Sequence, residues 1–251
     1  MARARALLRD AAAAVVLTGA GVSAESGVPT FRGGSGLWGQ FRAEDLATPE
    51  AFAGDPRLVW EWYAWRRTLV AECAPNAAHR ALAEWGLRRG AVAIITQNVD
   101  GLHARAARDA AGQLDPTPAI PLELHGSLFR DRCSGCDRRS DPVPVDATSV
   151  ATLPRCPRCG ALLRPDVVWF GEMLEEHVLS AADGAAATAD VCLVIGTSAL
   201  VYPAASLPLR TRAHGGVVIE VNPEETPLTR AAEVSIRGAA AEVVPQLVNE
   251  E

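Results

Sequence analysis

The sequence predicts an α/β fold in which helices cover both faces of a parallel sheet and a smaller second domain is inserted between the strands. The first observation is a set of short apolar runs that alternate with segments expected to be helical, as buried parallel strands do. The second is a pair of Cys-x-x-Cys motifs in a stretch rich in Pro, Arg and Asp. The apolar runs are Ala11–Leu17, Ala91–Thr96, Val191–Ile195 and Val217–Val221.

In the first third of the chain, one predicted strand leads into a glycine-rich turn. The strand Ala11–Leu17 ends at the tight turn Thr18–Gly21, and a helix is expected to begin near Ser23, with Glu25 close to its positive end. Residues 33–90 are expected to be mainly helical, with several tryptophans available for packing.

The remainder of the chain adds a short strand, an insertion and a closing helix. Residues 105–121 are expected to be a surface loop, because three prolines fall in this stretch. Leu122–Leu124 is a predicted strand that ends at His125, and the cysteine module follows at 126–165. A last helix is expected over 240–250.

Composition bounds the class of protein. The chain has 251 residues, of which 49% are hydrophobic, enough for one large domain with an insert. The net charge of −6 argues against general affinity for nucleic acid, which needs a basic face. Arginines before Ala11–Leu17 give some character of a signal peptide, but Asp10 interrupts it and cleavage would cut the glycine-rich turn. We therefore expect a cytoplasmic protein without a membrane span.

The cysteines have the spacing and ligand type of a structural zinc site. Nineteen residues separate the pair Cys133 and Cys136 from the pair Cys156 and Cys159. Four thiolates complete the zinc shell, so one metal ion is expected to stabilise the module and to carry no chemistry. Two redox-active pairs are the alternative, but such a pair belongs in a thioredoxin-like βαβ unit.

The turn after the first strand fits the pattern G-x-G-x-x-G/A. Gly19, Gly21 and Ala24 occupy the patterned positions, where backbone amides approach a pyrophosphate at the start of a helix. A plain strand-to-helix turn is the alternative. Dehydrogenases also place an acid about twenty residues on, at the end of a second strand. Glu44 and Asp45 fall there without a preceding strand, so a dinucleotide is expected to bind differently.

Longer motifs resemble one family. Residues 19–33, GAGVSAESGVPTFRG, resemble the NAD-binding loop of the sirtuins, which are NAD-dependent protein-lysine deacylases. Residues 97–103, QNVDGLH, resemble the Gln-Asn-x-Asp-x-Leu-His motif of that family. Further matches follow in the family's order over about residues 10–247: Leu124-His125-Gly126, Phe170-Gly171-Glu172, Gly196-Thr197-Ser198 and Asn222-Pro223.

The resemblance implies two domains with a cleft between them. A Rossmann-like NAD-binding domain would comprise residues 1–34, 91–125 and 166–251, with a helical insertion at 35–90 and the zinc module at 126–165. NAD, a consumed co-substrate, would meet an acyl-lysine peptide in the cleft. The residues implied for NAD are Gly19, Ala20, Gly21, Ala24, Glu25, Thr30, Phe31, Arg32, Trp38, Gln97, Asn98, Val99, Asp100, Gly196, Thr197, Ser198, Asn222, Pro223, Glu224 and Ala240.

The resemblance assigns catalysis to His125, Asn98 and Asp100. A neutral imidazole at a strand end is a suitable general base for a ribose hydroxyl near pH 7. An Asx turn is the structural alternative for Asn98 and Asp100. The implied products are free lysine, nicotinamide and O-acyl-ADP-ribose. The other histidines are expected to be structural, namely His79, His103, His177 and His214.

The acyl-lysine peptide is implied to bind as an added strand. Its expected contacts are Val168, Trp169, Phe170, Gly171, Val201 and Tyr202.

Tyr63 and Arg66 resemble the Tyr-x-x-Arg of the sirtuin branch that removes succinyl, malonyl and glutaryl groups. Their i, i+3 spacing places them on one face of a helix. Arg66 would pair with an acyl carboxylate, and the Tyr63 hydroxyl would add a hydrogen bond. An aromatic helix stripe with a half-buried arginine is the structural alternative.

Four other functions are weighed against an acid-selective deacylase. They are a protein-lysine deacetylase, ADP-ribosyl transfer to protein, an NAD-linked oxidoreductase, and a zinc-ribbon DNA-binding module, which the net charge disfavours. The expected partners are proteins or peptides bearing acyl-lysine, with no nucleic acid and no membrane, and the protein is expected to be a monomer.

Overall fold

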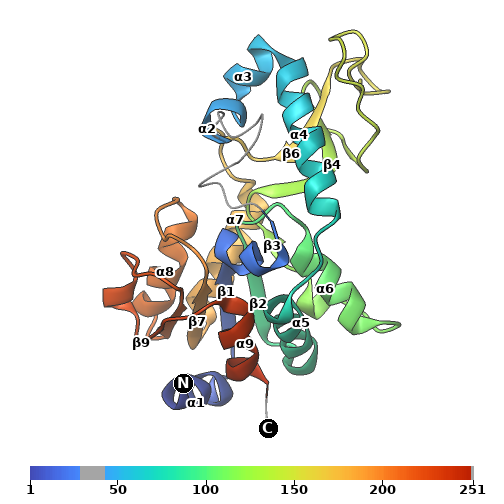
Figure 1. Cartoon of the computed structure of the whole chain (residues 1–251). Helices are drawn as coiled ribbons and strands as arrows, with labels where there is room; N and C mark the ends of the chain where they lie inside the picture. Colours follow the sequence, from blue (N-terminus) through green and yellow to red (C-terminus); the bar gives the residue numbers. More distant parts are fainter. Residues whose placement is uncertain (29–42, 250–251) are drawn as a thin grey trace.

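The fold is known from a computed structural model that describes residues 1–28 and 43–249 (Figure 1). Within these residues, six parallel strands form one sheet in the order β3-β2-β1-β7-β8-β9, and three antiparallel strands form another in the order β5-β4-β6. The predicted α/β fold class is therefore confirmed. The strands are β1 (Ala14–Thr18), β2 (Val92–Thr96), β3 (Leu122–Glu123), β4 (Gly126–Cys133), β5 (Arg139–Ser140), β6 (Leu163–Val167), β7 (Val191–Ile195), β8 (Val217–Val221) and β9 (Val234–Ile236).

Helices begin at capping residues that the sequence supplies. Asp55 accepts a hydrogen bond from the Leu58 amide and is followed by a proline at the first helical position, and Asn76 caps the next helix. The α-helices among the described residues are α1 (Ala2–Asp10), α2 (Ala43–Leu46), α3 (Pro49–Gly54), α4 (Pro56–Ala71), α5 (Ala77–Arg89), α6 (Leu102–Ala111), α7 (Glu176–Thr188), α8 (Leu207–Ala213) and α9 (Ala240–Val248). None of them is long and apolar enough to cross a membrane.

Two local expectations were wrong. The stretch 105–121 is not a loop throughout, because α6 covers its first part and the prolines come after the helix has ended. The turn after β1 does not lead into an α-helix near Ser23 but into a 3₁₀ helix, η1 (Ala20–Ser26). Glu25 therefore lies near the end of η1, and its carboxylate accepts a hydrogen bond from the Ala241 amide at the start of α9, at 2.6 Å.

The large sheet is buried on both faces because its strand residues alternate between two cores. Val16, Leu193 and Ile219 pack on one face with α1, α5 and α9. Val15 and Val194 pack on the other with residues of α7 and α8. The central strands are therefore apolar on both faces except at Thr18, Thr96 and Glu220, which is why the sequence contains nearly continuous apolar runs.

The smaller domain has a core of its own, drawn from both insertions. Helices α2 to α4 share this core with Cys133, Cys156 and Leu163 of the cysteine module. The Trp60 indole donates a hydrogen bond to the Leu163 carbonyl at 2.9 Å, across the two insertions. The predicted insertion 35–90 is divided within its described part, 43–90, because α5 packs on the large sheet while α3 and α4 pack with the cysteine module (Figure 1).

The strand order reverses between β1 and β7, which are neighbours in the sheet. Strands β2 and β3 lie on one side of this pair, and β8 and β9 lie on the other. In open parallel sheets, ligands bind at the carboxyl ends of the strands where the order reverses. Gly19 and Gly196 directly follow β1 and β7, so the loops that they begin lie where the strand order reverses.

These two loops contact each other backbone to backbone. A Cβ on Gly21 would lie 2.7 Å from the Gly196 Cα, and a Cβ on Gly196 would lie 2.5 Å from the Val22 nitrogen. Gly196 also has a φ of 58°, which side chains rarely adopt. The glycines are thus required by loop packing, in addition to any approach of a ligand.

Gly196→Ala is expected to reduce the free energy of unfolding by at least about 2 kcal/mol, because the methyl group meets backbone and the φ is strained. Urea unfolding measures this change. The matched control is Gly184→Ala in α7, where an added Cβ meets nothing within 4 Å. The control should stabilise the helix slightly. Equal effects of the two substitutions would contradict the packing argument.

Candidate functional site

Side chains from three loops link the carboxyl ends of β2, β7 and β8. The Gln97 side-chain amide donates to the Thr197 hydroxyl at 3.1 Å, and the Asn222 side-chain amide donates to the Thr197 carbonyl at 2.8 Å. These three residues were all predicted to contact NAD. They lie together at the switch point of the sheet, beside Gly19 and Gly21.

A buried polar cluster lies at the end of β2. The Ser23 hydroxyl donates to Asp100 at 2.7 Å and accepts from the Asn98 side-chain amide at 3.0 Å. Burial raises the pKa of the Asp100 carboxyl, while hydrogen bonds from the Leu102 amide, Ser23 and Asn98 oppose that shift. Asp100 accepts from the Leu102 amide at 2.9 Å, as in the Asx turn that was the structural alternative, and Asn98 and Asp100 are fixed in addition by Ser23.

Ser23 and His79 were not predicted as site residues. The Asn76 amide donates to His79 Nδ1 at 3.3 Å, so the His79 proton is on Nε2, which lies 3.3 Å from the Ser23 hydroxyl. Burial lowers the pKa of His79 to about 4, which keeps the ring neutral. A signal for Ser23 was present, since it lies inside the glycine-rich motif, but nothing in the sequence joins His79 to it.

His103 is buried next to His79, with ring centroids 4.6 Å apart. Its Nε2 lies 3.0 Å from the Thr18 hydroxyl at the end of β1. Burial lowers the pKa of His103 well below its ordinary value, and His79 adds to that shift. Two neutral, adjacent histidines thus contact Thr18 at the end of β1 and Ser23 of the polar cluster.

His125 is held in the tautomer that a general base needs. Its Nδ1 lies 2.9 Å from the Gln97 carbonyl oxygen, which can only accept, so Nδ1 carries the proton and Nε2 keeps its lone pair. Burial lowers the pKa of His125, and the hydrogen bond to Gln97 partly offsets that shift. The ring is therefore neutral near pH 7, and Nε2 is available to accept a proton.

Gly126 lets the chain turn sharply after His125. Its φ is 77°, and an added Cβ would lie 2.0 Å from the Asp166 carbonyl oxygen. The Val168 amide in turn donates to the His125 carbonyl at 2.9 Å. The candidate base is thus joined to the segment predicted to hold a peptide.

The residues predicted to contact a peptide include exposed apolar side chains on two loops. Phe170 is 48% exposed, and across the other loop Val201 and Tyr202 are 43% and 72% exposed. The amides of Val168, Trp169 and Phe170 already donate within the protein. A peptide strand here would have to pair with other backbone groups than these three amides.

Tyr63 and Arg66 both lie on α4 but in different surroundings. Tyr63 is completely buried, and its hydroxyl accepts a hydrogen bond from the Trp169 indole at 2.9 Å. Burial raises the pKa of Tyr63 to about 12, with the nearby Arg66 opposing that shift, so the phenol stays protonated. Trp169 is itself fixed, because the Arg164 guanidinium lies 3.4 Å from its ring centroid and forms an ion pair with Glu172.

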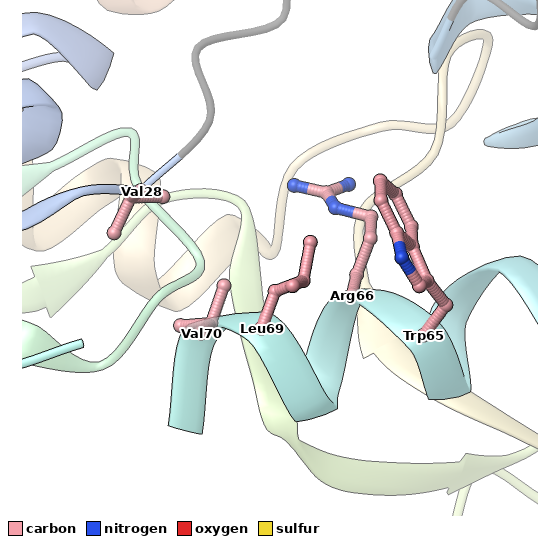
Figure 2. Close-up of a pocket in the computed structure, with 5 residues that line it drawn as sticks. All are labelled: Val28, Trp65, Arg66, Leu69 and Val70. Carbon is pink, nitrogen blue, oxygen red and sulfur yellow. The ribbon is translucent and has the colours of Figure 1, made fainter. Parts of the chain in front are cut away.

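Arg66 lines a small cavity with Val28, Trp65, Leu69 and Val70 (Figure 2). The guanidinium extends from α4 beside the Trp65 ring, away from the helix. The cavity has a volume of about 30 Å³. One water molecule needs roughly 10–15 Å³ of such a cavity, so the space suits a group of about carboxylate size. Burial lowers the pKa of Arg66, while Tyr63 and Asp100 oppose that shift.

The four cysteines form a metal-binding cluster. Their sulfur atoms all lie within 4.8 Å of one another. Cys133 Sγ is 3.4 Å from Cys159 Sγ, and Cys136 Sγ is 3.8 Å from Cys156 Sγ. A tetrahedral zinc ion with Zn–S bonds of about 2.3 Å separates its sulfurs by about 3.8 Å, so the cluster fits one zinc ion. The amides of Gly135 and Cys136 also point at Cys133 Sγ, at 3.3 and 3.4 Å.

Four residues predicted to contact NAD lie outside the described part of the chain, namely Thr30, Phe31, Arg32 and Trp38. Of the others, the structure brings together Gly19, Gly21, Gln97, Gly196, Thr197 and Asn222 at the switch point. Ala24 and Glu25 are exposed on η1, and Ala240 lies at the start of α9, next to the Ala241 amide that Glu25 accepts from.

The fold and the site together define a class: a nucleotide-binding α/β domain with a candidate histidine base and a zinc-stabilised insertion. The Sir2 family model matches residues 19–203. An NAD-dependent protein deacylase of Pyrococcus furiosus is 49% identical over 247 residues, covering 97% of this chain and 95% of that protein. The chain belongs to the Sir2 family.

Solved structures agree over almost the whole chain. A Sir2 homologue in complex with NAD superposes with a TM-score of 0.88 at 49% identity, covering 99% of this chain and 92% of the other. A Sir2 structure bound to an acetylated peptide superposes with a TM-score of 0.82 at 30% identity, covering 98% and 96%.

Purified protein is expected to hold one zinc ion per chain at the four-cysteine cluster. Cys133→Ser should lower both the melting temperature and the metal content, because metal binding supplies folding free energy. Elemental analysis and thermal unfolding measure the two effects. Cys73→Ser, outside the cluster, is the matched control and should keep the metal. Zinc-free wild-type protein with full activity and stability would contradict the assignment.

Proposed function

We propose that this protein is an NAD-dependent protein-lysine deacylase that prefers acidic acyl groups such as succinyl and malonyl. The observation that carries the deacylase part is the neutral His125, which follows β3 and whose Nδ1 is bound by the backbone of Gln97, the residue directly before Asn98. The relatives support it, since one is named as an NAD-dependent deacylase and others are complexes with NAD and with an acetylated peptide.

When bound, NAD supplies a ribose carbon that exchanges nicotinamide for the acyl oxygen. The chain's own residues would act around that carbon. The loop at Gly19 to Gly21 would receive the pyrophosphate, and Val99 and Asp100 the nicotinamide side. His125 Nε2 would take the proton of the ribose hydroxyl that attacks the acyl group, because its Nδ1 is already bound to Gln97.

The preference for acidic acyl groups rests on Arg66 and Tyr63. A half-buried guanidinium at a carboxylate-sized cavity favours an anionic ligand, with which it can form a bidentate pair. The indole of Trp169 can only donate, so it occupies a lone pair of the Tyr63 hydroxyl and leaves the phenol proton to be donated. A carboxylate accepts such a proton, whereas an acetyl group offers nothing at that position.

We further propose that the protein acts as a cytoplasmic monomer on acyl-lysine proteins. None of the cysteines forms a disulfide among the described residues, and Cys73 and Cys192 lie outside the zinc cluster, which is typical of a reducing compartment and supports this location.

His125→Tyr should abolish turnover while the fold and NAD binding persist. Loss of a general base costs about 10²–10⁴-fold in rate, measured as nicotinamide release with an acyl-lysine peptide. His177→Tyr is the matched control, since the His177 side chain is 77% exposed. A His125 variant with more than half the wild-type rate would contradict the role.

The same assignment predicts the acid limb of the pH profile. Neutral His125 is the active form, and its pKa is lowered, so activity should fall only as the pH drops through a value below the ordinary histidine pKa of about 6.5. More than half of the maximal rate should therefore remain at pH 6.5.

Arg66→Met should reduce desuccinylation by at least about 10²-fold, because the bound acyl group would bury the pair and removing one partner of a buried charge pair costs about 2–5 kcal/mol. Deacetylation should fall far less, so the ratio of the desuccinylation rate to the deacetylation rate measures the contribution of the pair between Arg66 and the acyl carboxylate. Arg57→Met is the matched control on the same helix, where the arginine forms an exposed i, i+4 pair with Glu61. Equal losses with both substrates would mean that Arg66 supports the fold or the NAD site. A wild-type preference for acetyl-lysine would indicate a deacetylase.

A further inference from the structure

Glu220 is a buried carboxylate that the proposed chemistry does not use. It lies on β8, in the interior of the large sheet, and is only 1% exposed. A buried carboxylate is costly unless it is hydrogen-bonded or paired. The hydrogen-bond partners of the Glu220 carboxylate therefore indicate which part of the structure it stabilises.

Three hydroxyl groups donate to this carboxylate. Thr226 donates to Oε1, Thr229 donates to Oε2 at 2.7 Å, and Ser235 of β9 donates to Oε2 at 2.8 Å. Thr226 and Thr229 belong to the loop that leaves the carboxyl end of β8. Both oxygens of Glu220 are thus used to hold that loop, and one also holds the neighbouring strand.

The direction of these hydrogen bonds requires an acceptor at position 220. The Thr226 hydroxyl oxygen accepts from the Leu228 amide at 3.1 Å, and the Thr229 hydroxyl oxygen accepts from the Thr226 amide at 2.9 Å. Each hydroxyl has one proton, which is left to donate to Glu220. A carboxylate accepts on both oxygens, whereas the amide of a glutamine would present a donor on one side.

Arg237 completes the arrangement from the other side of the loop. Its guanidinium lies 3.7 Å from Glu220 and donates to the Glu224 carbonyl at 2.6 Å and to the Thr229 hydroxyl at 3.2 Å. Residues 222–229 are therefore held between a buried anion on β8 and a cation that follows β9. Asn222, Pro223 and Glu224, which the family resemblance assigns to NAD, occupy the start of this loop.

We propose that Glu220 and Arg237 are positioning residues for NAD: together they preorder loop 222–229 at the switch point before the dinucleotide binds. The inference rests on the proposed NAD-dependent activity. Because loop 222–229 is already ordered in the free protein, NAD binding does not have to include the entropic cost of ordering it. The pair should thus set the affinity for NAD and leave the chemistry at His125 untouched, since neither residue contacts the acyl-transfer side.

The test is the split between KM and kcat in Glu220→Gln and Arg237→Met. Each variant should raise the KM for NAD by about tenfold, the ratio that corresponds to one lost charge-assisted hydrogen bond. The kcat at saturating NAD should stay within about threefold of wild type, because the reacting groups are unchanged. Binding of ADP-ribose, measured by calorimetry, should weaken in parallel, and amide hydrogen exchange should rise in residues 222–231. Glu233→Gln is the matched control, since Glu233 pairs with Arg3 at the surface.

Several outcomes would overturn the proposal. An unchanged KM for NAD with a lower melting temperature would make Glu220 a residue of the fold only, and a lower kcat with unchanged KM would place it in the chemistry. If Glu220→Gln does not fold, the partly exposed Arg237→Met and the isosteric Thr229→Val carry the same test. Wild-type protein that binds no ADP-ribose and releases no nicotinamide would contradict the proposed function itself, a failure that the variants cannot mimic.

Discussion

The contact between the loops after β1 and β7 is the constraint on which the site depends. Gly21 and Gly196 touch where the strand order reverses, and neither position can accept a Cβ. This contact brings the ends of the central strands close enough for single side chains to join them. Gln97 reaches Thr197, and Asn222 reaches the same residue from β8. The direction of His125 follows, because its Nδ1 binds the backbone of Gln97.

The second domain supplies what the sheet cannot, namely helix α4 with Tyr63 and Arg66, the proposed acyl contacts. Helix α4 and the cysteine module share one apolar core, and Arg67 reinforces it through the Leu128 carbonyl and Asp131. Zinc is expected to stabilise the cysteine module, since the module is too small to bury much apolar surface by itself. The same core fixes Trp169 against Tyr63, so the metal site and the proposed acyl pocket depend on one packed unit.

Much of the architecture could be predicted because its signals are local. The strands at Val191–Ile195 and Val217–Val221 have the predicted bounds, since their residues are buried on both faces and, apart from Glu220, are apolar. The four cysteines converge as their spacing predicted. Helix α6 was not predicted, because the prolines that follow its end favour a loop for the whole stretch 105–121. The contacts of Ser23 with His79 and of Glu220 with Thr226 could not be predicted from the sequence. They depend on strand order and on hydrogen-bond direction, and no sequence motif indicates either of these.

The most direct test of the central claim is product analysis by mass spectrometry with wild-type protein, NAD and a succinyl-lysine peptide. A deacylase of the proposed kind releases nicotinamide, free lysine peptide and an O-succinyl-ADP-ribose in equal amounts, and forms none of these without NAD. Consumption of NAD with formation of NADH and no nicotinamide would indicate hydride transfer and would contradict the account.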